Sequence, residues 1–297
     1  MIRVFRCEDT LTGILTGVYD AWDSRLGHAN VRLTSSAVEN LELFCEYADV
    51  EPDAEKAGKV FRTVERRMGM EAADMIAYAA ACPHEKKADA IYRMIVMGLH
   101  LPDGREVCHM LTCPEVRLIF ELRRKAWHIA HRYMGFVRFR ELENGGLFAV
   151  IEPEADVLAM IAPHFADRLP LEHWAILDRI RGRAAVHPAG KNWFLLDEVD
   201  EKSLSMPADS CEEPYFQRLW RGFHRAVGIE ERENRRLQQA FLPLKFRHIM
   251  TEFQDQESQD GCGDVSVGGV FLKGKKFVKS ERESGVFLAE VRENAFY

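Results

Sequence analysis

The side chains with the greatest capacity for chemistry lie in the middle of the chain, between His128 and Arg183. Within this segment, His164, Asp167 and Arg168 fall inside one run of five residues. A histidine can act as a general base, an aspartate can orient it, and an arginine can hold an anion. A salt-bridged turn uses the same residue types, so the catalytic and structural interpretations both stay open. Pro163 directly precedes the group and predicts an irregular turn in place of a helix.

A second set of polar residues surrounds the end of the preceding helix. His131 lies on or beside an apolar stripe that contains Trp127 and Met134, where a hydrogen-bonded core histidine is the commoner interpretation. Arg138 and Arg140 follow on one face of an expected strand, and burying them requires either internal carboxylates or a bound phosphate. The catalytic hypothesis places four side chains at one centre: His131, His164, Asp167 and Arg168.

A local excess of positive charge follows between residues 215 and 250. The whole chain has a formal net charge of −7, whereas this segment has eight lysines and arginines against three glutamates, which leaves +5. Arg218, Arg221 and Arg225 share one helical face, and Phe216, Trp220 and Phe223 lie nearby in sequence. Such a face is typical of sequence-tolerant nucleic-acid grooves, and a solvated basic helix is the alternative. Three further cations are candidates for phosphate contacts: Arg179, Arg181 and Lys245.

The sequence contains no standard cofactor or metal motif. It has no phosphate loop, no dinucleotide-binding glycine pattern, no HExxH and no GxSxG, so we predict no cofactor. Cys108, His109 and Cys113 carry ligand atoms, but their spacing is not that of a zinc site, so we predict no metal. Seven scattered cysteines without a CxxC pair favour a reducing cytoplasm. No long apolar run or signal-peptide core is present, which predicts a cytoplasmic protein without a membrane span.

Residue periodicity predicts an α+β fold with a largely helical N-terminal half, a small and mainly antiparallel sheet in the middle, and a helical closing segment. A strand at 2–6 precedes the first helices, and the pair Ser36 and Glu39 resembles a capping box for a helix toward Tyr47. The predicted helices span 11–22, 36–47, 52–68, 71–81, 85–99 and 114–133, with a short one from 153. The predicted middle strands span 136–140, 147–151, 174–178, 184–187 and 192–196.

We expect one domain over residues 1–253 and a polar tail over 254–297. Within the domain, the helical part covers 1–133, the sheet region 135–197, and the closing helices 214–250. Gly228 and Pro243 are expected to interrupt the closing helices. The tail is rich in glycine, serine and charge, with short apolar groups, and is either loosely ordered or an added hairpin.

Seven stretches of the sequence occur in a fixed order: GILTGVYD at 13–20, HRYMGFVRF at 131–139, APHFADR at 162–168, WAILD at 174–178, LWR at 219–221, IEEREN at 229–234 and PLKFR at 243–247. Together they resemble a bacterial family known only as "probable DNA metabolism protein". Genes of that family typically neighbour one for a radical-SAM protein associated with DNA modification or repair. Some members are fused to a domain similar to uracil-DNA glycosylases. The resemblance covers roughly residues 1–253 and assigns no catalytic residue.

The resemblance and the basic segment together predict an accessory protein of DNA repair or modification, which binds DNA and acts with a radical-SAM or glycosylase-like partner. The chain lacks the CxxxCxxC triad of radical-SAM proteins, so the partner must hold any iron–sulfur cluster. The alternative is an enzyme that hydrolyses or edits a nucleotide or damaged base at the histidine centre. A third hypothesis, a scaffold for a protein partner alone, predicts an exposed apolar patch without a basic cleft.

Overall fold

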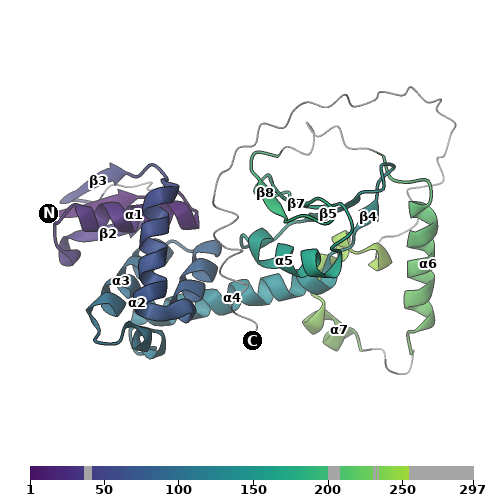
Figure 1. The fold of residues 1–297 in the computed structure, drawn as a ribbon. Coiled ribbons are helices and arrows are strands. Elements are labelled where there is room, and N and C mark those ends of the chain that lie inside the picture. Colours follow the sequence, from purple (N-terminus) through teal and green to yellow (C-terminus); the bar gives the residue numbers. More distant parts are fainter. Residues whose placement is uncertain (37–41, 200–207, 230–231, 233, 254–297) are drawn as a thin grey trace, which may run out of the picture.

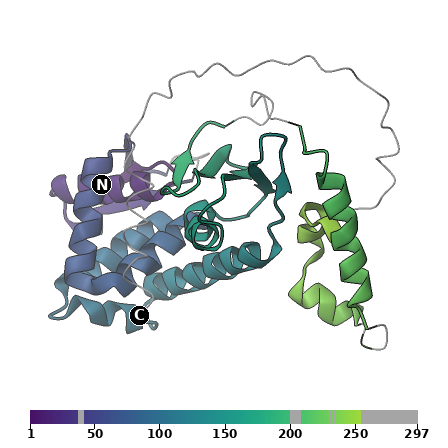
Figure 2. The same cartoon turned by 45° about the vertical axis from the view of Figure 1, so that its right-hand side comes forward.

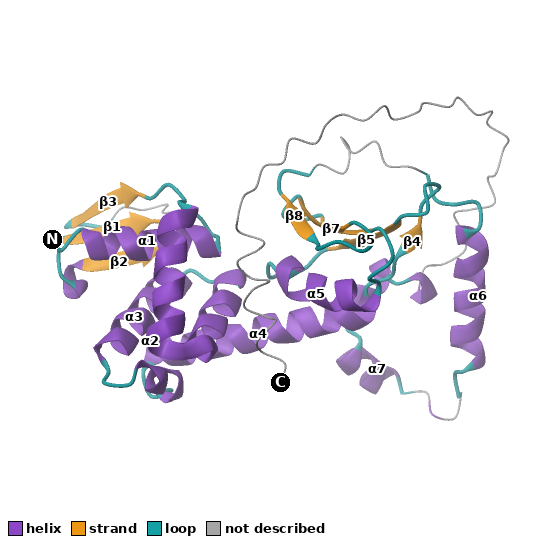
Figure 3. Cartoon of the chain, viewed as in Figure 1, coloured by secondary structure: helices purple, strands orange, loops and turns teal. Residues whose placement is uncertain are grey.

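The computed structural model describes residues 1–36, 42–199, 208–229, 232 and 234–253, and its fold is α+β, as the sequence predicts. Figure 1 shows one sheet at the N-terminal end and a second sheet in the other half of the molecule. Figure 3 separates the strands from the helices that lie between and beside the two sheets. No helix in the described part of the chain is long and apolar enough to cross a membrane.

The N-terminal sheet is parallel and has the order β2-β1-β3. Its strands are β1 (Ile2–Arg6), β2 (Val31–Thr34) and β3 (Cys45–Asp49), and the helix α1 (Leu11–Asp23) connects the first two. The Thr10 hydroxyl caps α1 by accepting a hydrogen bond from the Gly13 N–H at 3.0 Å. Phe5, Val31 and Leu33 are buried with the apolar face of α1. The predictions for β1 and α1 are therefore confirmed.

The predicted helix from Ser36 toward Tyr47 is wrong for the residues of this range that the structure describes. Residues 37–41 lie outside the described residues, and Tyr47 lies in β3, paired with Val4 of β1. A capping box is a local signal, whereas β3 owes its conformation to pairing with a strand more than 40 residues away. The predicted helical N-terminal half therefore contains a parallel sheet that periodicity did not indicate.

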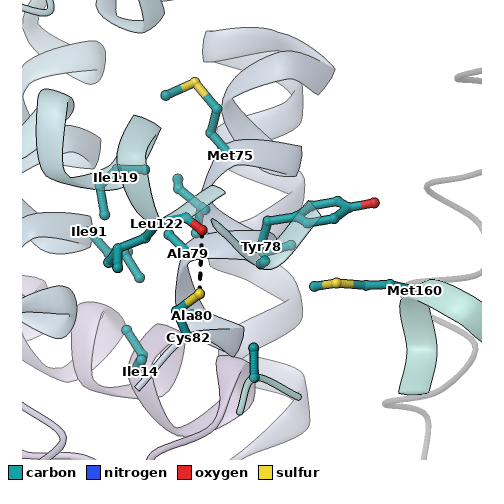
Figure 4. Close-up of a cluster of buried hydrophobic side chains, with 14 of the residues drawn as sticks. Ile14, Met75, Tyr78, Ala79, Ala80, Cys82, Ile91, Ile119, Leu122 and Met160 are labelled. Carbon is teal, nitrogen blue, oxygen red and sulfur yellow. Dashed lines mark hydrogen bonds between the residues drawn. The ribbon is translucent and has the colours of Figure 1, made fainter. Parts of the chain in front are cut away.

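Three helices build the adjoining core: α2 (Ala54–Ala81), α3 (Lys87–His100) and α4 (Pro114–Phe136). Gly69 has φ of 85° inside α2, so the two helices predicted at 52–68 and 71–81 are both present on either side of it. The short 3-10 helix η2 (Gly104–His109) connects α3 to α4. Figure 4 shows their buried contact, in which the Cys82 thiol donates a hydrogen bond to the Leu122 carbonyl at 3.3 Å.

The second sheet has five strands in the order β4-β5-β6-β7-β8. The strands are β4 (Arg140–Glu141), β5 (Leu147–Ile151), β6 (Trp174–Asp178), β7 (Arg183–His187) and β8 (Phe194–Leu196). The helix α5 (Leu158–Arg168) connects the parallel pair β5 and β6, and every other pair is antiparallel. This arrangement confirms the predicted, mainly antiparallel sheet with one crossing helix.

The expectation that Pro163 prevents a helix is wrong, because α5 continues through it. A proline inside a helix removes one hydrogen bond and costs about 3 kcal/mol. The apolar face of α5 offsets this cost, since Leu158, Ile161 and Phe165 are all buried. His164, Asp167 and Arg168 consequently project from a regular helix.

The closing segment consists of α6 (Glu213–Ala226), α7 (Arg235–Phe241) and the 3-10 helices η4 (Leu244–Ile249) and η5 (Thr251–Phe253). Its interruptions fall near Gly228 and Pro243, as predicted. Figures 1 and 2 both place α6 at the end of the molecule opposite the N-terminal sheet. The single domain over 1–253 stays a prediction, and the tail 254–297 lies outside the described residues.

Substitution of Gly17 tests the packing of α1 on the parallel sheet. An added β-carbon would lie 2.2 Å from the Cys7 sulfur and 3.3 Å from Leu33 Cδ2. We expect Gly17→Ala to lower the free energy of unfolding by about 1–3 kcal/mol in denaturant titrations, because the core would be overpacked. Gly135→Ala is the control, since a β-carbon there meets nothing within 4 Å. Adding Cys7→Ala to Gly17→Ala should restore part of the loss, and an unchanged Gly17→Ala stability would contradict this packing.

Candidate functional site

A narrow stripe of residues holds α6 against the rest of the protein. The buried Glu213 carboxylate accepts a hydrogen bond from the Glu141 N–H at 2.9 Å. Farther along the helix, the Trp220 indole N–H donates to Glu252 at 3.0 Å, and the His224 ring lies 5.8 Å from the Phe253 ring. Glu213, Trp220 and His224 are separated by seven and four residues, so they share one side of the helix. The other sides of α6 are left for other contacts.

Arg138 and Glu252 form the central contact of this attachment. The Arg138 guanidinium, just after α4, donates two hydrogen bonds to the Glu252 carboxylate at 2.8 and 3.3 Å. It also lies over the Trp220 ring at 5.4 Å. Burial alone would raise the pKa of Glu252, but hydrogen bonds from Arg138, the backbone and Trp220 lower it below its ordinary value. The carboxylate thus stays charged and joins α4, α6 and η5.

One side of α6 carries an uncovered row of apolar side chains. Its members recur at intervals of three and four residues, so they lie along one side of the helix. The described residues leave each about half exposed: Phe216 49%, Leu219 50%, Phe223 57% and Val227 57%. We call this row the apolar stripe of α6. Contact between water and so many large apolar side chains on one helix is unfavourable.

The three arginines predicted for phosphate binding lie on the opposite side of α6. At about 100° per residue, Arg218, Arg221 and Arg225 point away from the apolar stripe. Arg218 and Arg225 are exposed and Arg221 is half-buried, and no ion pair joins any of the three to another described residue. Phe216 and Phe223 therefore do not interleave with the arginines on one face, contrary to the groove that the sequence suggested.

The other cations predicted for phosphate contacts are paired with carboxylates. The sequence left two kinds of partner open for Arg138 and Arg140, internal carboxylates or a bound phosphate, and the structure contains internal carboxylates. The expected shared strand face is wrong, because β4 begins only at Arg140. The pairs are Arg138–Glu252 at 2.8 Å, Arg140–Asp209 at 3.0 Å, Arg179–Glu152 at 2.7 Å, Arg181–Asp178 at 3.0 Å, and Lys245–Glu154. Such pairs satisfy the charges locally and hold the elements together.

The four residues of the catalytic hypothesis lie on two helices, α4 and α5, that pack against each other. His131 projects from α4, and His164, Asp167 and Arg168 share one side of α5 at intervals of three and four. Burial and the Arg168 charge lower the pKa of His164, and His131 contributes in the same direction while Asp167 opposes it. His131, Asp167 and Arg168 are exposed and His164 is half-buried, so the group lies at the surface.

The structure adds two residues that the sequence did not indicate. The Trp127 ring stacks on His131 with centroids 5.0 Å apart and planes 25° apart, and 47% of the residue is exposed. The spacing of four residues on a helix was a usable signal for this pair. Glu252 is the other addition, and its distance in sequence from Arg138 left no local signal.

No group of three or more histidine, cysteine, aspartate or glutamate side chains in the described ranges is arranged to hold a metal ion. Cys108 is buried, which raises its pKa to about 11, with a further contribution from Glu71. A thiol with such a pKa is protonated at neutral pH and is a poor ligand.

Comparison with protein families assigns residues 85–252 to a domain of unknown function, DUF4130. The match covers more than half of the chain, and the chain belongs to this family. It begins close to the start of α3 and ends in η5, so it includes α4, α5 and α6. None of the curated proteins matches the chain.

Replacing Glu252 tests the attachment of α6. We expect Glu252→Gln to accelerate hydrogen exchange of the α6 amides roughly tenfold, because Arg138 and Trp220 would lose a charged acceptor. Hydrogen exchange in α3 should not change.

The pH dependence of the attachment gives a second test of Glu252. In the wild-type protein the contribution of Glu252 to the stability of this attachment is complete above its ordinary pKa of 4.5 and is lost as the pH falls through the lower folded value. Acidification below about pH 4.5 should thus loosen α6 in the wild type and have little further effect in the variant. Equal protection of α6 in both proteins would contradict the role of Glu252.

Proposed function

We propose that the protein is an accessory protein of DNA metabolism that uses opposite sides of α6 to bring nucleic acid and a protein partner together. The observation that carries this proposal is that the described residues leave two sides of one helix uncovered. Arg218, Arg221 and Arg225 lie on one side without carboxylate partners among the described residues. The apolar stripe lies on the other.

The arginine side is suited to phosphate groups. Guanidinium groups bind phosphate oxygens through paired N–H donors and keep their charge at any cellular pH. The chain as a whole is acidic, so a local cationic row is required for contact with a polyanion. The other cations predicted for phosphate contacts already have carboxylate partners, which favours the α6 arginines over them as the phosphate-binding groups. These paired cations are Arg138, Arg140, Arg179, Arg181 and Lys245.

The apolar stripe of α6 is suited to contact with a protein partner. Large aromatic and aliphatic side chains form the buried centres of protein interfaces, whereas nucleic-acid backbones require cations. The resemblance to the "probable DNA metabolism protein" family supports a radical-SAM or glycosylase-like protein as the partner. In this role the partner carries out the modification or repair reaction, and the present chain holds it on the nucleic acid.

A second candidate function is an enzyme that hydrolyses or edits a nucleotide or damaged base. It is favoured by the position of His131 and His164 on two packed helices, where their charges interact. The lowered pKa keeps His164 neutral at pH 7, so it can accept a proton, and Asp167 and Arg168 lie beside it. Product formation from nucleotides or damaged oligonucleotides that disappears in His164→Ala would establish this function. A wild-type protein without turnover would remove it.

Removal of the three α6 arginines tests the nucleic-acid side. We expect the Arg218→Ala, Arg221→Ala, Arg225→Ala variant to bind labelled DNA at least tenfold more weakly in fluorescence anisotropy. The slope of log affinity against log salt should fall by about 2–3, since roughly one counterion is released per phosphate contact. The matched control removes the same charge from α2, as Arg62→Ala, Arg66→Ala, Arg67→Ala. Equal losses in both variants would mean that net charge alone matters, and the proposed contact would be wrong.

Polar substitution of the apolar stripe tests the protein side. We expect Leu219→Gln, Phe223→Gln to weaken binding of the proposed radical-SAM partner by at least tenfold in calorimetry, because central apolar residues dominate such interfaces. DNA affinity should be unchanged. Leu171→Gln is the control, since this leucine is 79% exposed outside α6. Wild-type partner affinity in the double variant would exclude the stripe as the docking surface.

A further inference from the structure

An exposed aromatic ring on α4 lies beside two histidine rings. Trp127 is 47% exposed and is not part of the hydrophobic core. His131 stacks on it at 5.0 Å, and the His128 ring meets it edge-on at 5.2 Å. Because His131 is itself exposed, these rings form an aromatic platform at the surface. An aromatic platform of this kind offers ring surface to a planar ligand.

Cationic and imidazole groups border this platform on the side of α5. α4 and α5 pack against each other, and His164 of α5 lies near enough to His131 for their charges to interact. Arg168 follows His164 by one turn on the same side of α5. No ion pair joins Arg168 to another residue in the part of the chain that the structure describes. An aromatic surface beside an unpaired guanidinium matches the two parts of a nucleotide, a planar base and an anionic phosphate.

We propose that Trp127, His131, His164 and Arg168 form a subsite for one nucleotide of a single-stranded nucleic acid, with the base on the Trp127 platform and a phosphate at Arg168. This inference rests on the proposed function and specifies its substrate class. In a duplex the faces of the bases are stacked on one another and only their edges are accessible. An unpaired base presents its face to an aromatic side chain, and stacking of this kind tolerates any base sequence.

The proposed subsite is linked to α6 through the C-terminal end of α4. Trp127 precedes Gly135 by eight residues, which is about 12 Å along the helix axis. Arg138 comes three residues after Gly135, and its guanidinium lies over the Trp220 ring of α6. One continuous helix therefore connects the proposed base platform to the attachment of α6.

A second tryptophan–histidine pair supplies a matched control. Trp22 is 41% exposed and lies 4.6 Å from His28, but that ring is tilted by 58° rather than stacked. His28 Nδ1 is hydrogen-bonded to the Tyr92 hydroxyl at 2.8 Å. The nearby Arg93 donates to the carbonyls of His28 and Val31. The groups that would meet a nucleotide are thus already engaged at Trp22.

The test compares Trp127→Ala with Trp22→Ala for binding to a labelled oligothymidylate and to a labelled duplex of equal length, by fluorescence anisotropy. We expect Trp127→Ala to bind the single strand about fivefold or more weakly, as loss of one stacked base implies. Duplex affinity should change less than twofold, and Trp22→Ala should match the wild type on both ligands. Trp127→Phe should keep most of the single-strand affinity, and Arg168→Ala should reduce its salt slope by about one.

The outcomes separate this inference from the proposed function. If the α6 triple variant loses DNA affinity while Trp127→Ala binds the single strand normally, the subsite is wrong and the proposed function stands. If Trp127→Ala weakens single strand and duplex equally, the subsite is also wrong. If the wild-type protein binds neither ligand at low salt, both proposals are overturned. Unchanged circular dichroism of Trp127→Ala, together with retention of affinity by Trp127→Phe, would assign the loss to stacking.

Discussion

The burial of one side of α4 is the constraint on which the rest of the structure depends. Near its start, Val116 and Ile119 are buried in the core that α4 shares with α2 and α3. Farther along, Ile129 and Tyr133 are buried where the helix meets α5 and the second half of the molecule. A single rigid helix therefore connects the helices beside the parallel sheet to those beside the mixed sheet (Figure 2). The side chains on its solvent side, Trp127 among them, are held in place by this packing.

The same helix determines where α6 lies. Arg138 follows the last turn of α4, and its ion pair with Glu252 brings η5 and Trp220 to that position. α6 contributes little to the core, because only Glu213 among its residues is buried. Because the described residues contact α6 along one stripe, they leave its cations and its apolar groups exposed on two other sides of the helix.

Local periodicity was sufficient to predict elements whose burial is set by their own sequence. β1 and β6 have the predicted bounds, and α1 and α4 differ from the predictions by three residues at most. The strands β2 and β3 were missed because they are short and their pairing partner, β1, is distant in sequence. The helix through Pro163 was missed because the burial of its apolar face outweighs the local cost of proline. In both cases tertiary contacts outweighed a local signal.

The candidate site could be predicted only where residues act through helical spacing. The shared side of Arg218, Arg221 and Arg225 follows from spacing alone, and so does the pairing of Trp127 with His131. The ion pair of Arg138 with Glu252 joins residues 114 positions apart, so no local pattern indicates it. The rotation of about 100° per residue also puts Phe216 and Phe223 on the side of α6 opposite the arginines. Closeness in sequence therefore did not mean a shared face.

The residues of both proposed surfaces lie within the part of the chain that defines the family. α4, α5 and α6 all fall between residues 85 and 252, whereas β1, β2, β3 and α2 precede that range. The residues on which the proposed function rests thus lie within the family domain, and the parallel sheet precedes that domain in the sequence. In the proposed function, this acidic chain would contact nucleic acid through the arginine side of α6 and a protein through the apolar stripe.

The central claim is that the two ligands occupy different sides of α6, and the affinity of the partner protein in the presence of saturating DNA tests it most directly. Calorimetric titration of the DNA-bound protein with the radical-SAM partner should give an affinity within about threefold of that for the DNA-free protein, with a ternary complex in sedimentation. Mutual exclusion, in which DNA blocks the partner and the partner releases DNA, would place both ligands on one surface and contradict this account.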